Sequence, residues 1–217
     1  MLAKVFSCAV VGLDGVLVEV EVDVGAGHPG MVVVGLPDAA VQESKERVRS
    51  AIRNSGGKFP HGRVTVNLAP ADLKKAGPTY DLPIALGILI GSRQVPPGVE
   101  DALFVGELSL DGVLRHTPGI LSMVALAVGK GMRRIFVPHA DAAEAALVTG
   151  TEVFPVRTLA DLVNHLTGEA PIAPFQGEDD HGDVSTYVGT DFSEIKGQEH
   201  VKRGLEVAAA GGHNLLM

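Results

Sequence analysis

The sequence predicts an α/β fold in which helices pack against a mixed β-sheet. Three observations indicate it: the chain begins with strand-like alternation, the later apolar segments alternate between strand and helix patterns, and the composition is that of a globular protein. Of 217 residues, 46% are hydrophobic and 20% are charged, which excludes wholesale disorder. A chain of this length can bury a large core, so we expect it to fold without a disulfide or a metal ion.

The first elements are a predicted β-hairpin. Over 16–24 a valine at every second position alternates with other residues, mostly acidic, the pattern of a strand with one buried and one solvated face. The segment 5–13 precedes it, and we expect the turn at Asp14-Gly15 because this dipeptide tolerates positive φ. The acidic face could indicate a cation site, but a solvated sheet surface is the favoured interpretation. Its residues are Glu19, Glu21 and Asp23.

Strands and helices alternate after the hairpin. A buried strand is predicted over 31–36 and a helix over 37–54, which Gly56-Gly57 ends. The later predicted elements are strand 63–68, helix 81–92, strand 103–110, helix 118–131, strand 134–137, helix 140–148, strand 153–156, helix 158–167, helix 198–210 and strand 213–217.

The helix over 37–54 carries a basic stripe. Lys45, Arg49 and Arg53 follow one another at i, i+4 and i+8 and therefore share a face. The surrounding segment 43–63 holds six basic side chains against two acidic ones. A surface that faces phosphate groups is the functional interpretation. A solvated helix face is an equally good one.

Most of the net charge of −8 belongs to one segment. Residues 169–183 carry five carboxylates and no Lys or Arg, whereas 1–168 carry 15 basic and 17 acidic side chains. The segment is also poor in apolar residues and rich in Pro and Gly. We predict an exposed linker over 169–190, between a domain over 1–168 and a C-terminal piece over 191–217.

Several kinds of site are excluded by their residue types. The single cysteine, Cys8, cannot form an internal disulfide and fits a reducing compartment. No two of the eight histidines stand at i and i+4, so no metal site is predicted. No apolar run approaches the ~20 residues of a membrane-spanning helix, and we expect a cytoplasmic protein without membrane contact. Gly77-Pro78-Thr79 is a candidate nucleophile loop.

Four motifs resemble the N-terminal domain of the ComM/YifB family, which are magnesium-chelatase-like AAA+ ATPases. The motifs, which stand in family order within 1–168, are Val34–Pro37, Arg47–Ile52, Val66–Leu73 and Tyr80–Ala85. The resemblance implies the α/β fold of the Lon proteolytic domain, which GHMP-type kinases share. It also implies that Thr79 takes the position of the Lon serine and Leu121 that of its lysine. A leucine cannot accept a proton, so the resemblance implies a degenerate dyad and no catalytic residue.

The segment Asp191–Glu199 resembles the entry to an AAA+ module. The resemblance implies that Ile195, Gly197 and Gln198 line the adenine edge of ATP in the full-length protein. The chain is expected to be a fragment that stops just before the Walker A loop. We therefore expect no cofactor for the fragment, and ATP with Mg²⁺ for the full-length protein.

The family implies an ATP-driven ring, expected to be a hexamer, that acts on DNA as a branch-migration helicase in natural transformation. The domain would then serve ring assembly, DNA contact or both. Two alternatives remain: a residual Thr79-dependent Lon-like peptidase, and a pure oligomerisation module. The residues expected to neutralise DNA phosphates are Lys45, Arg49, Arg53, Lys74 and Lys75.

Overall fold

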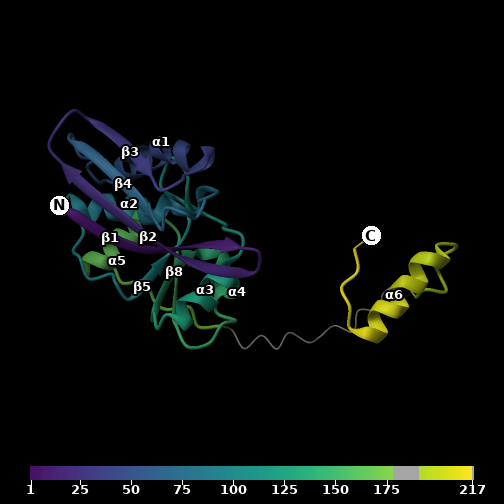
Figure 1. The fold of residues 1–217 in the computed structure, drawn as a ribbon. Helices are drawn as coiled ribbons and strands as arrows, with labels where there is room; N and C mark the ends of the chain where they lie inside the picture. The colour runs from purple at the N-terminus through teal and green to yellow at the C-terminus, as the bar shows by residue number, and fades with distance from the viewer. Residues whose placement is uncertain (178–190, 217) are drawn as a thin grey trace. The chain divides into compact units, whose positions relative to one another are not determined.

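A computed structural model describes residues 1–177 and 191–216 (Figure 1). The chain divides into two compact units, Met1–Gly177 and Glu178–Met217. Residues 178–190, which belong to the predicted linker, and Met217 lie outside the described residues. The rest of the predicted linker, 169–177, belongs to the first unit, because Phe175 N donates to Val153 O at 2.7 Å and the Phe175 ring packs on the core.

The first unit is built on a mixed seven-stranded sheet of order β3-β4-β2-β1-β5-β8-β9. The pairs β1–β2 and β2–β4 are antiparallel and the other four are parallel. This confirms the predicted fold class. The strands are β1 (Leu2–Val11), β2 (Asp14–Gly25), β3 (Gly30–Val34), β4 (Arg63–Ala69), β5 (Ala102–Phe104), β8 (Arg134–Pro138) and β9 (Glu152–Val156). A separate small hairpin pairs β6 (Glu107–Leu108) with β7 (Leu114–Arg115).

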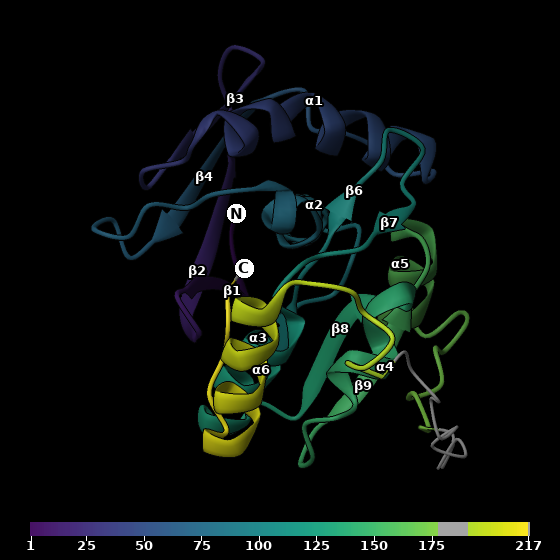
Figure 2. The same cartoon turned by 90° about the vertical axis from the view of Figure 1, so that its right-hand side faces the viewer.

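The helices cover both faces of the sheet. Residues of α1, α2 and α5 form one core cluster with β1, β2 and β4, and those of α3 and α4 form a second with β5 and β8. All residues of α2 are buried, because apart from Asp81 in its first turn the helix is apolar on every side, and because it lies between α1 and the sheet (Figure 2). The helices of this unit are α1 (Ala39–Asn54), α2 (Asp81–Gly91), α3 (Ile120–Gly129), α4 (Ala142–Ala145) and α5 (Leu159–Thr167), with the 3₁₀ turns η1 (Pro78–Tyr80) and η2 (His139–Asp141).

The first hairpin differs from prediction at its turn. Val11 pairs with Asp14, so the turn residues are Gly12 and Leu13, and Gly12 takes the positive φ of 66°. Gly15 is instead a strand residue that α3 approaches closely, since a Cβ there would lie 2.7 Å from Ser122 O. The dipeptide Asp14-Gly15 is therefore not the turn.

The acidic face of β2 is a partly solvated sheet surface, which agrees with the favoured interpretation. Lys4 on the neighbouring strand lies 2.5 Å from Glu19 and 3.4 Å from Glu21. Asn67 on the other side donates to Glu21 at 2.8 Å. The carboxylates are thus partnered by side chains of adjacent strands, and on the opposite face Val18, Val20 and Val22 are fully buried.

Four other predicted elements need correction. The strand 31–36 is not buried: β3 is an edge strand, and of its valines only Val33 is buried. The strand 103–110 is broken at Gly106, whose φ is 159°. The helix 140–148 is reduced to η2 and the short α4. The segment 213–216 is not a strand, because no described strand pairs with it.

The second unit contains helix α6 (Glu199–Gly211), close to the predicted 198–210. Gly197 and Gln198 precede it with positive φ of 74° and 62°. Lys202 Nζ donates to Ile195 O at 2.7 Å and ties the preceding turn to the first turns of α6. Among the described helices of both units, none combines the length and the apolar character that crossing a membrane requires.

Candidate functional site

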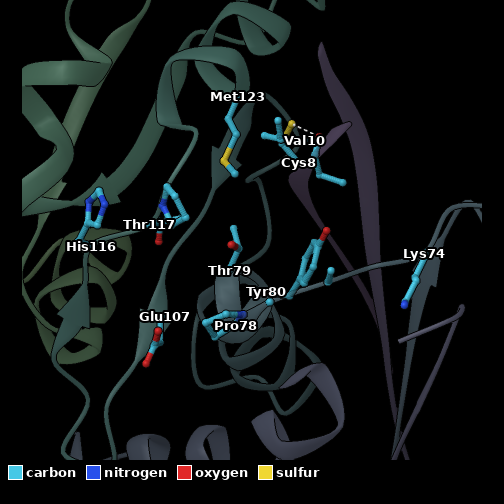
Figure 3. Close-up of a pocket in the computed structure, with 14 residues that line it drawn as sticks. Cys8, Val10, Lys74, Pro78, Thr79, Tyr80, Glu107, His116, Thr117 and Met123 are labelled. Carbon is cyan, nitrogen blue, oxygen red and sulfur yellow. Dashed lines mark hydrogen bonds between the residues drawn. The ribbon is translucent and has the colours of Figure 1, made fainter. Parts of the chain in front are cut away.

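A cavity of about 210 Å³ opens beside Thr79 in the first unit (Figure 3). Its wall is formed by β1, by the loop and 3₁₀ turn before α2, by β6, by the connection between β7 and α3, and by α3. The side chains that matter for chemistry are Cys8, Lys74, Thr79, Glu107, His116 and Thr117. This is the place where the Lon resemblance predicts a nucleophile, and acyl transfer there would need an activated hydroxyl or thiol with a base in reach.

The backbone around Thr79 is held firmly. Asp38, which caps α1 by accepting from Val41 N at 2.8 Å, uses its second carboxylate oxygen to accept from Gly77 N at 3.1 Å. Gly77 has a φ of 82°, and Thr79 O accepts from Gly106 N at 3.0 Å. The Thr79 side chain is largely buried but faces the cavity (Figure 3). A hydroxyl is therefore presented there on a fixed turn.

A histidine–aspartate pair stands at the rim of the same cavity. Asp141, only 2% exposed, contacts His116 Nδ1 at 2.5 Å and accepts from Thr117 N at 2.9 Å. The hydrogen bond and negative charge of Asp141 raise the pKa of His116. Sequence reasoning missed this pair, because the two residues are far apart in the chain and form no recognisable motif. Within 1–177, no hydrogen bond joins His116 to Thr79.

Cys8 offers no alternative nucleophile. Its thiol is buried, and that burial raises its pKa to about 11. The thiol donates to Ala9 O at 3.2 Å. Because only the thiolate attacks carbonyl groups readily, Cys8 stays protonated and inert near neutral pH.

The two positions of the expected dyad do not line a common cavity. Leu121 does not line the Thr79 cavity; it is 45% exposed and lines a separate cavity with Leu13 and Leu126. No lysine replaces it: Lys74 contributes to the cavity wall, yet no hydrogen bond within the described residues joins its ammonium to Thr79.

The five residues expected to contact DNA fall into separate places. Lys45, Arg49 and Arg53 share the outward face of α1. Lys74 is exposed on the loop before η1. Lys75 does not fit the expectation, because it is fully buried and its Nζ donates to Pro70 O. Burial also lowers the pKa of Lys75, and its buried ammonium is not placed to neutralise a phosphate.

The residues expected to line adenine lie in the second unit. Ile195, Gly197 and Gln198 stand together in the turn before α6, and Ile195 is 38% exposed. The Ile195 side chain and the backbone groups of Gly197 and Gln198 suit contact with the edge of a base. None of the three residues supplies a charge for phosphates. Across the described parts of both units, no group of three or more His, Cys, Asp or Glu residues is placed to hold a metal ion.

The fold and the Thr79 cavity define a mixed α/β domain of the kind that the resemblance to Lon implies. A family profile described as "Subunit ChlI of Mg-chelatase" matches residues 20–141, and one described as "Magnesium chelatase, subunit ChlI" matches 191–217. The chain therefore belongs to the family of the ChlI subunit of magnesium chelatase.

Individual relatives place it near the ComM/YifB proteins. Competence protein ComM of Haemophilus influenzae is 42% identical over 218 residues, which cover 99% of this chain and 43% of ComM. YifB of Salmonella typhimurium is 42% identical over 217 residues, or 100% of this chain and 42% of YifB. Lon protease of Trichlorobacter lovleyi is 21% identical over 178 residues, or 76% of this chain and 22% of that protease. The chain thus spans less than half the length of these relatives, and the weaker match to Lon is consistent with the fold.

Proposed function

We propose that this chain is a non-proteolytic domain of a magnesium-chelatase-like AAA+ ATPase, and that it contacts DNA through the outward face of α1. The observation that supports DNA contact is how the basic residues of α1 are used. Arg47 turns inward and pairs with Asp81, whereas Lys45, Arg49 and Arg53 form no ion pair within the described residues. Three cations on one helix face, none in an ion pair within the described residues, suit a phosphate backbone.

The proposal extends to the whole protein through its relatives. The name of ComM, a competence protein, fits an ATP-driven role in processing DNA during natural transformation, such as branch migration in the cytoplasm. ATP and Mg²⁺ would bind the full-length protein, where Ile195, Gly197 and Gln198 of this chain would line the base. AAA+ ATPases of this kind act as rings, and we propose that this domain also supports assembly of a hexamer.

The Thr79 cavity supports the non-proteolytic part of the proposal. A threonine hydroxyl needs a base within hydrogen-bond reach to become a nucleophile. The Leu121 side chain cannot serve, and neither His116 nor a lysine is hydrogen-bonded to Thr79 within residues 1–177.

DNA contact is tested by fluorescence anisotropy with a labelled single strand and a branched DNA, at about 50 and 200 mM salt. The triple variant Lys45→Gln/Arg49→Gln/Arg53→Gln should bind all DNA more weakly, with a salt slope shallower by about 2 to 3. A control triple variant removes the same charge from exposed positions elsewhere. Its substitutions are Arg93→Gln, Lys130→Gln and Arg133→Gln. Equal losses in the two triple variants, or no binding by the unmodified chain, would contradict DNA contact by α1.

A further inference from the structure

A second cavity, of about 230 Å³, lies against the basic face of α1. Its walls come from three segments: the start of β3, the outward face of α1, and the loop between α1 and β4. The lining residues are Pro29, Gly30, Met31, Lys45, Glu46, Arg49, Phe59 and Pro60. Arg53, the third residue of the basic stripe, does not line it. Of the three basic residues, Lys45 and Arg49 therefore line the cavity and Arg53 lies outside it.

Two side chains that line this cavity, Arg49 and Phe59, form a stacked pair. The guanidinium carbon of Arg49 lies 5.4 Å from the centroid of the Phe59 ring, a cation–π arrangement. Phe59 is half-buried and packs against the main core cluster, which anchors its ring. Aromatic rings and arginine planes are the surfaces on which proteins stack unpaired bases.

The charges in the wall limit which ligand fits. Lys45 and Arg49 contribute two positive charges and Glu46 one negative charge, so the cavity carries a net charge of about +1. This balance matches one phosphodiester better than the several charges of a free nucleoside triphosphate. The carboxylate of Glu46 can also accept a hydrogen bond from the amino group of a base.

We propose that this cavity binds one unpaired nucleotide of a DNA strand, with its base against the Arg49–Phe59 pair and its phosphate beside Lys45. In a duplex the bases are stacked inside the helix and cannot enter a concave site without flipping. The proposal rests on the proposed DNA contact and adds a preference for single-stranded DNA.

The test compares a labelled single strand with the matching duplex, using anisotropy and the 217-residue chain. The unmodified protein should bind the single strand more tightly, by about tenfold. Phe59→Leu keeps an apolar side chain on the core but removes the ring, and it should lower single-strand affinity by about five- to tenfold. Its duplex affinity should stay the same. Arg53→Gln, the matched control outside the cavity, should weaken both forms equally.

A second variant keeps the test decisive if Phe59→Leu folds poorly. Arg49→Lys preserves the charge at an exposed position but removes the guanidinium plane, so it should also reduce the single-strand preference. Equal affinity for both forms of DNA, unaffected by either variant, would overturn the nucleotide site while leaving DNA contact intact. Absence of binding to every DNA would overturn the proposed function and this site together.

Discussion

Arg47 and Asp81 form a bidentate ion pair that joins α1 to the first turn of α2. Arg47 Nε donates to one carboxylate oxygen of Asp81 at 2.7 Å and Arg47 Nη2 to the other at 3.2 Å. Leu108 N donates to the same carboxylate at 3.2 Å, so the Asp81 side chain, which is fully buried, connects α1, α2 and β6. Thr79 stands two residues before Asp81, and the pair therefore also helps to fix the turn that borders the cavity.

We predict that Arg47→Met destabilises the domain by about 3–5 kcal/mol, because it leaves a buried carboxylate without its cation. Arg53→Met on the exposed side of the same helix should change the free energy of unfolding by less than about 0.5 kcal/mol. Urea denaturation of both variants measures the difference. Similar losses in the two variants would show that the ion pair does not hold the elements together.

The same carboxylate should make stability depend on pH. Burial raises the pKa of Asp81 to about 6, although the hydrogen bonds from Arg47 oppose the shift. The folded state therefore holds this proton more tightly than the unfolded state. Its contribution to stability is fully present below the ordinary pKa of 3.8 and is lost as the pH rises through about 6.

Asp81→Asn removes that titration and isolates its effect. Relative to the variant, the unmodified protein should lose about 2–3 kcal/mol of stability between about pH 4 and pH 7. Urea melts of both proteins at several pH values give this difference. A flat difference across the range would mean that Arg47 offsets the burial completely.

We predict that restoring a lysine at the position implied by the Lon resemblance does not create a peptidase. Leu121 lines a cavity other than that of Thr79, so the amine of Leu121→Lys would emerge away from the hydroxyl. Neither the unmodified chain nor this variant should cleave a broad peptide library. Cleavage that Thr79→Ala abolishes would instead establish the residual peptidase.

The elements with strong local patterns could be predicted from the sequence. The apolar spacing and the Asp38 cap define α1 to within a few residues, and alternating valines define β2. The edge position of β3 could not be predicted, because Met31–Val34 is equally apolar whether or not another strand covers it. Strand order depends on partners far along the chain.

The candidate sites show the same limit. Nothing in the Lys74-Lys75 dipeptide distinguishes an exposed lysine from one whose ammonium is buried against Pro70 O. The approach of His116 to Asp141, and that of Arg49 to Phe59, depend on how distant segments fold back. Local patterns therefore indicate which residue types are present, while the tertiary fold decides which of them meet.

Two glycines of the first hairpin provide a test of where its turn lies. Gly12 has a φ of 66° and open space around its Cα, since a Cβ added there would meet no atom within 4 Å. Asparagine tolerates this left-handed conformation, so Gly12→Asn should cost less than about 1 kcal/mol.

At Gly15 a Cβ would lie 2.7 Å from Ser122 O and 2.8 Å from Leu126 Cβ, and neither atom is the flexible end of a side chain. Gly15→Asn should therefore push α3 away from β2 and cost about 1–3 kcal/mol or more. The melting temperatures of the two variants test the position of the turn. A turn at Asp14-Gly15 would make Gly15→Asn the more stable variant and Gly12→Asn the less stable one.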